Sequence, residues 1–186
     1  MEELTGADDM IEAVAMVRYA LWILLPPEIE ATFREAKQLA DNALGGLDFV
    51  PHLTLAGAFD TDFDHVKSIC ETELLTGQSA GTLQGDAVSV IPQQYEIGTT
   101  AFTALYLRCK IGPALHAIRH SLHGVALLPV RGFVPHISLY YGTADESARQ
   151  DVLSQLPLPI RPFKAERFAI AREGKEPLQW DVVAEI

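Results

Sequence analysis

Two histidines are each followed, two positions later, by a hydroxyl residue: His52 by Thr54, and His136 by Ser138. Each pair lies in a segment of seven residues, and five of the seven positions are identical between residues 49–55 and residues 133–139. Residues two apart on a β-strand point to the same face of the sheet. Each segment therefore presents an imidazole and a hydroxyl together, while its leucines and isoleucine point the other way. Packing alone rarely requires such a combination twice.

Two imidazoles and two hydroxyls around one point suit displacement at phosphorus. One imidazole can take a proton from water, and the other can give a proton to the leaving oxygen, because the pKa of histidine lies near working pH. The hydroxyls can hold the equatorial oxygens of a five-coordinate transition state. This chemistry requires the two segments to meet, and the sequence leaves open which histidine is the acid and which is the base.

The elements around the two segments repeat in the same order, which favours a duplicated fold. The order is strand, helix, strand, helix, strand, and then the same again with one extra strand. We expect strands at residues 14–25, 50–59, 82–91, 101–110, 134–141, 160–172 and 178–186, and helices at 28–43, 62–75, 113–123 and 145–155. The prediction is an α+β fold in two pseudo-symmetric lobes, each an antiparallel-rich sheet with outer helices, and an active-site cleft between the lobes. We expect one domain over residues 1–186, with halves at about 14–91 plus the C-terminal strands and at about 100–172.

Composition and charge favour a small substrate. The 186 residues, 48% of them hydrophobic, suffice for one domain with a core. The formal net charge of −11 disfavours an extended nucleic-acid partner, because such binding relies on neutralising phosphates. The N-terminus lacks a signal-peptide pattern, and no apolar run approaches the roughly 20 residues of a membrane span. We expect a cytoplasmic monomer without membrane contact, with Cys70 and Cys109 as reduced thiols.

The paired His-x-Thr/Ser segments resemble those of the 2H phosphoesterase superfamily. Within it, the chain looks most like the eukaryotic cyclic phosphodiesterases that act on ADP-ribose 1'',2''-cyclic phosphate and on nucleoside 2',3'-cyclic phosphates. Three further features are similar to that branch: Trp22 before the Pro26-Pro27 turn, the continuation of the second segment to Tyr141-Gly142, and Phe102 near the start of the second half.

The resemblance implies a role for each matching residue. His52 and His136 would be the catalytic acid/base pair, and Thr54 and Ser138 would bind the phosphate. Tyr141 would bind the phosphate or line the site, although a regular strand would point it away, so a bulge or strand end must turn it inward. Two aromatic residues, Trp22 and Phe102, would flank the base or ribose.

The predicted function is hydrolysis of a small nucleotide-type cyclic phosphate to a phosphomonoester, without metal or cofactor. His116 and His120 have metal-ligand spacing on a helix, but no HExxH pattern and no third ligand accompany them. One alternative is an RNA-end or 2',5'-oligonucleotide phosphodiesterase, and another is a non-catalytic nucleotide-binding module. The uncharged residues 56–58 after the first segment argue against an RNA end, and the second intact histidine argues against a pure binder.

Overall fold

Over the described residues, an antiparallel sheet of eight strands forms the centre of the fold. The computed structural model describes residues 17–128, 132–174 and 178–186. The strands lie in the order β6-β3-β4-β5-β2-β1-β7-β8. Their bounds are β1 Arg18–Leu24, β2 His52–Asp60, β3 Ser89–Ile97, β4 Leu105–Ile111, β5 His136–Tyr140, β6 Phe163–Lys164, β7 Phe168–Glu173 and β8 Trp180–Glu185. The expected α+β class is confirmed.

The two halves of the sheet repeat the same strand register. In one half Trp22 pairs with Thr54 and Leu24 with His52. In the other half the corresponding pairs are Tyr106 with Ser138 and Arg108 with His136. A one-residue irregularity follows in both, at Leu55 in β2 and at Leu139 in β5, and the two halves join where Leu53 pairs with Ile137. This internal symmetry confirms the predicted pseudo-symmetric duplication.

In the part of the chain that the structure describes, four α-helices flank the sheet, and local sequence explains where they begin and end. They are α1 Pro27–Leu44, α2 Phe63–Ser79, α3 Pro113–Val125 and α4 Glu146–Leu153. Proline opens α1 and α3, where its missing N–H costs nothing. Asp62 caps α2 by accepting a hydrogen bond from the backbone N–H of His65. Gly45, in the left-handed conformation with φ 71°, ends α1.

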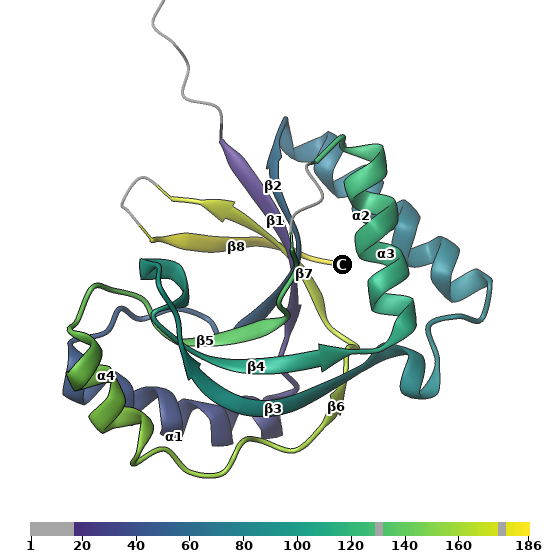
Figure 1. Ribbon diagram of the computed structural model, residues 1–186. Coiled ribbons are helices and arrows are strands. Elements are labelled where there is room, and N and C mark those ends of the chain that lie inside the picture. The colour runs from purple at the N-terminus through teal and green to yellow at the C-terminus, as the bar shows by residue number, and fades with distance from the viewer. Residues whose placement is uncertain (1–16, 129–131, 175–177) are drawn as a thin grey trace, which may run out of the picture.

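The helices pack in two pairs, α1 with α4 and α2 with α3, on different sides of the sheet centre (Figure 1). The α1–α4 pair lies against β5 and β3, and the other pair against β2 and β1. The alternate residues of both segments are fully buried in this core: Leu53, Leu55, Ile137 and Leu139. Burying each such side chain contributes roughly 1.5–3 kcal/mol. This packing fixes which face of the central strands is left for His52 and His136.

Three expected strands differ from the structure. The strand expected at 82–91 begins only after a short 3₁₀ turn η1 at Gly85–Val88. As β3 it continues into residues 92–97, which lie between two of the expected strands. Phe102 lies in a second 3₁₀ turn, η2 at Ala101–Thr103, because β4 starts only at Leu105. The strand expected at 160–172 is two strands, β6 and β7, with different partners. Residues 14–16 of the first expected strand lie outside the described residues.

Within the three described ranges, no helix is both long enough and apolar enough to cross a bilayer.

Cys70 and Cys109 are free and buried, and burial raises the pKa of each thiol to about 12. Both thiols are therefore protonated and serve as core side chains at neutral pH.

Candidate functional site

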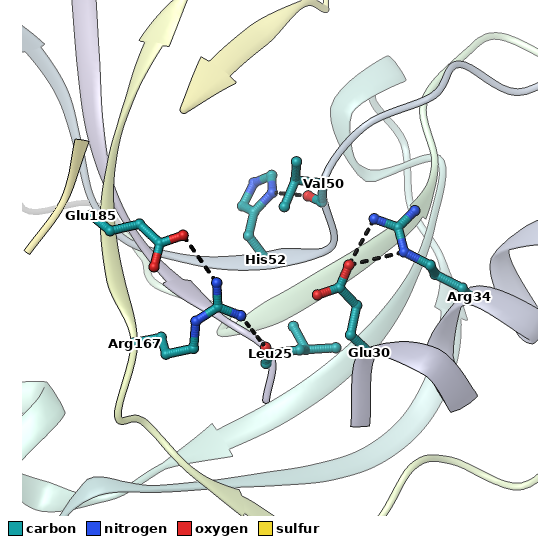
Figure 2. A network of polar contacts seen from close by, with 7 residues as sticks. All are labelled: Leu25, Glu30, Arg34, Val50, His52, Arg167 and Glu185. Carbon is teal, nitrogen blue, oxygen red and sulfur yellow. Dashed lines mark hydrogen bonds and ion pairs between the residues drawn. The ribbon is translucent and has the colours of Figure 1, made fainter. Parts of the chain in front are cut away.

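The same backbone contact orients both histidine rings. Nδ1 of His52 lies 2.7 Å from the carbonyl oxygen of Val50 (Figure 2), and Nδ1 of His136 lies 2.8 Å from that of Val134. A carbonyl oxygen only accepts hydrogen bonds, so each Nδ1 carries the hydrogen. Each Nε2 is left as the nitrogen that can accept or donate a proton.

The strand register brings the two motifs together on one face of the sheet. Because Leu53 pairs with Ile137, the antiparallel register places His52 across from Ser138 and Thr54 across from His136. Opposed residues on one face have Cβ atoms about 4.5–5.5 Å apart. The structure therefore gathers the four motif residues into one cluster centred on the junction of the two halves.

The ring of His52 is enclosed. It is stacked on the indole of Trp22, with ring centroids 3.4 Å apart and planes within 6°, and the residue is only 7% exposed. Burial lowers the pKa of His52 to about 3. The hydrogen bond to the Val50 carbonyl raises this pKa, and the charge of His136 lowers it further. His52 is consequently neutral at working pH.

Arg167 holds the end of β1 that follows Trp22. Its guanidinium donates from Nη1 to the carbonyl of Leu25 at 3.2 Å and from Nη2 to the carboxylate of Glu185 at 3.0 Å (Figure 2). These bonds connect β1 with the end of β8. They keep the strand that carries the indole in place beside β2.

His136 has a different aromatic neighbour. The ring of Tyr106 meets it edge-on with centroids 5.2 Å apart. The Tyr106 hydroxyl donates to Glu96 at 2.7 Å, and the same carboxylate forms a 2.7 Å ion pair with Nε of Arg108. Burial lowers the pKa of His136, and the bond to the Val134 carbonyl opposes that shift. The two histidines are thus equivalent in position but not in surroundings.

Tyr141 reaches the motif residues, and the bulge at Leu139 explains how. The irregularity shifts the alternation by one residue, so Tyr141 lies on the face of Ser138 and its hydroxyl bonds to the Ser138 side chain. Burial raises the pKa of Tyr141. Its ring stacks on Phe49 with centroids 4.2 Å apart.

Phe102 and Trp22 do not occupy equivalent positions. Phe102 is 46% exposed, lies edge-on to Tyr141 at 6.0 Å, and accepts a 3.2 Å hydrogen bond from the Ser138 hydroxyl through its carbonyl oxygen. Trp22 is 2% exposed and packs on His52. The equivalent of Trp22 is Tyr106, since each pairs with the hydroxyl residue of its half.

A cavity of about 540 Å³ adjoins the cluster, and most of the residues lining it were not singled out from the sequence as site residues. Its lining includes Thr54, Gly57, Tyr106, Arg119, Phe133 and His136. The Arg119 guanidinium lies 3.9 Å from the centre of the Phe133 ring, and its Nη1 donates to the carbonyl of Leu55 at 3.0 Å. Spacing could have revealed Tyr106, which precedes His136 by as many residues as Trp22 precedes His52. No comparable signal marks Arg119.

Among the residues that the structure describes, no group of three or more His, Cys, Asp or Glu side chains is placed to hold a metal ion. Of the three α3 histidines, His123 is buried with its Nε2 2.6 Å from Nη1 of Arg119, whereas His116 and His120 are exposed. His116 lies edge-on to Phe133. The described site consists of imidazoles, hydroxyls, aromatic rings and the guanidinium of Arg119.

Comparison with known proteins identifies the family of the chain. The model of the 2'-5' RNA ligase superfamily matches residues 25–177, which is most of the chain. The chain belongs to this superfamily, whose members are the 2H phosphoesterases. The resemblance inferred from the paired motifs is confirmed at this level. Membership supports assigning the chain to the phosphoesterases.

Individual relatives of the superfamily are similar over nearly the whole chain. A protein of Arabidopsis thaliana named cyclic phosphodiesterase is 25% identical over 183 residues, covering 94% of this chain and 97% of its own. TT0787 of Thermus thermophilus has a TM-score of 0.58 at 15% identity, covering 90% of this chain and 96% of its own. E. coli LigT complexed with 3'-AMP has a TM-score of 0.53 at 14% identity, covering 92% and 97%. At these identities the two bacterial structures support the fold alone.

Proposed function

We propose that the protein is a cyclic phosphodiesterase that uses His52 and His136 as its acid/base pair and needs no metal. One observation carries the proposal. Two imidazoles, each with Nδ1 bonded to a backbone carbonyl and Nε2 left for proton transfer, lie on one face with two hydroxyls across from them. The Arabidopsis relative of the same family bears the name cyclic phosphodiesterase, which supports this choice.

In the proposed reaction water attacks phosphorus in line with the leaving oxygen of the ring. One Nε2 takes the proton of the water, the new P–O bond forms, the ring P–O bond breaks, and the other Nε2 protonates the departing oxygen. Thr54 and Ser138 donate hydrogen bonds to the non-bridging oxygens, and Tyr141 supports Ser138 through the bond between their hydroxyls. Each proton-transfer partner contributes on the order of 10²–10⁴-fold in rate.

The proposed substrate is a small cyclic phosphate of nucleotide type, either ADP-ribose 1'',2''-cyclic phosphate or a nucleoside 2',3'-cyclic phosphate. A cavity of about 540 Å³ is of the size that holds a nucleotide. E. coli LigT was solved with 3'-AMP, a monoester that opening of a 2',3'-cyclic phosphate can give. All the groups of the proposed site come from one chain, so we propose that a monomer is active. We propose that the rings of Tyr106 and Phe102 flank the base or ribose, because the ring of Trp22 is covered by His52.

The test is a panel of cyclic phosphates with products identified by phosphorus NMR. We expect conversion of the cyclic signal into a monoester signal by the wild-type protein, and little conversion by His136→Ala. The control is His120→Ala, which changes an exposed histidine of α3. Binding without conversion of any member of the panel would reject the proposed activity and favour a nucleotide-binding module.

The name of the family supports a second candidate substrate class, which is an RNA end or a 2',5'-linked oligonucleotide. The net charge of −11 disfavours a long polyanion. Relative kcat/KM on a mononucleotide 2',3'-cyclic phosphate and on an RNA ending in the same group separates the two. We expect the mononucleotide to react at least as well, and a strong preference for the RNA would reassign the substrate.

A further inference from the structure

One cation lines the cavity beside the motif cluster, and the proposed proton transfers do not use it. Among the described residues that line this cavity of about 540 Å³, Arg119 is the only lysine, arginine, aspartate or glutamate. The chain as a whole carries a formal net charge of −11. A single arginine in a cavity of such an acidic protein favours a ligand with negative charge at that point.

Contacts with both motif segments fix the guanidinium of Arg119. Its Nη1 donates to the carbonyl of Leu55 at 3.0 Å and lies 2.6 Å from Nε2 of His123. One face of the group lies over the Phe133 ring, with Cζ 3.9 Å from the ring centre. Leu55 directly follows Thr54 in the first segment, and Phe133 opens the second segment. The guanidinium is therefore held next to the cluster that would take the cyclic phosphate.

The remaining edge of the guanidinium carries donors that the described residues leave unused. Among these residues, no hydrogen bond uses Nε or Nη2 of Arg119, and none of the ion pairs includes it. Nε and Nη2 together present two parallel N–H donors, which match two oxygens of one phosphate group.

Burial adds a reason for an anion at this edge. It lowers the pKa of Arg119, because a partly buried charge has lost some of its hydration. The Leu55 carbonyl and the Phe133 ring compensate only in part, since neither carries a full negative charge. A bound phosphate would supply that charge.

We propose that Arg119 binds a second phosphate group of the substrate, separate from the cyclic phosphate between the two histidines. This inference rests on the proposed function. The preferred substrate is then a cyclic phosphate whose ribose carries a further phosphate, and a nucleoside whose cyclic phosphate is its only anionic group binds less well. The second phosphate takes no part in the reaction, so Arg119 acts on substrate selection.

The experiment compares adenosine 2',3'-cyclic phosphate with the same compound carrying a phosphate on its 5'-oxygen. We expect the wild-type protein to favour the 5'-phosphorylated compound by about 10–150-fold in kcat/KM, the range given by hydrogen bonds to a charged group. The difference should lie mainly in KM, because this phosphate does not react. In Arg119→Gln the ratio between the two compounds should fall to near one.

Two further variants make the comparison specific. Arg119→Lys keeps the positive charge but not the pair of parallel donors, so its preference should lie between those of the wild type and Arg119→Gln. Arg161→Gln removes one positive charge from a side chain that is 73% exposed and does not line this cavity. It should keep the full preference for the 5'-phosphate.

Equal losses of Arg119→Gln on both compounds would overturn the inference and leave Arg119 as a tie between α3 and β2. Absence of any preference in the wild-type protein would overturn it as well. Failure of the wild type to convert either compound would reject the proposed function instead. Calorimetric titration with the same two compounds then decides the inference: a 5'-phosphate that lowers Kd in the wild type but not in Arg119→Gln supports it, and equal Kd values contradict it.

Discussion

Acidification is expected to destabilise the folded protein through His52. The pKa of this ring is about 3 when folded, against an ordinary value near 6.5 when unfolded. Between these values the unfolded chain holds a proton that the folded chain excludes, so stability falls as pH drops through this window. Lowering the pH from 7 to 4.5 should cost about 2.5 kcal/mol through His52 alone, at about 1.36 kcal/mol per pKa unit.

The assay is urea unfolding at pH 7 and at pH 4.5 for the wild-type protein and for His52→Asn. Asparagine keeps an N–H near the position of Nδ1 that bonds Val50, but it does not titrate. Carboxylates and other histidines titrate in both proteins, so their contribution cancels in the difference. We expect the wild type to lose about 2.5 kcal/mol more than the variant. Equal losses would show that His52 is protonated at pH 4.5 in the folded protein as it is in the unfolded chain. This result would refute the reasoning about its burial.

Three further predictions concern the hydroxyls, metals and the core. Thr54→Ala and Ser138→Ala should each raise the barrier in kcat/KM by about 1.5–3 kcal/mol, the value of a hydrogen bond to a charged group, and intact-mass spectrometry should detect no phospho-enzyme. Exhaustive chelation should leave turnover of a cyclic phosphate unchanged, and loss of activity with recovery on adding Mg²⁺ or Zn²⁺ would contradict the proposed site. Leu53→Ala, at the junction of the halves, should lower the free energy of unfolding by about 2–5 kcal/mol, whereas Leu158→Ala, 90% exposed, should change it little.

The duplicated motif made the fold and the central cluster predictable from the sequence. Two matched strand segments imply a symmetric arrangement, and alternation assigns the histidines and hydroxyls to one face. The requirement that Tyr141 be turned inward by a bulge could also be stated in advance. The structure supplies that bulge at Leu139, with an equivalent at Leu55.

Strand limits and long-range neighbours were less predictable. The polar run around Pro92 resembles a loop, yet it belongs to β3, where a register irregularity between Pro92 and Tyr95 removes the need for regular pairing. The family resemblance implies the same flanking role for Phe102 and Trp22, but only the strand register shows that the position equivalent to Trp22 is Tyr106. Arg119 reaches the cavity from α3 through tertiary packing, and no local pattern in the sequence encodes that contact.

The central claim is that two histidines transfer protons to and from one cyclic phosphate, and the pH profile of kcat/KM tests it most directly. The wild-type protein is predicted to give a bell-shaped profile on a nucleoside 2',3'-cyclic phosphate, with two apparent pKa values that belong to the coupled pair. His52→Ala and His136→Ala should each remove one limb and lower kcat by about 10²–10⁴-fold, with the double variant losing less than the product. Loss of turnover in His120→Ala with His136→Ala unaffected would contradict the account.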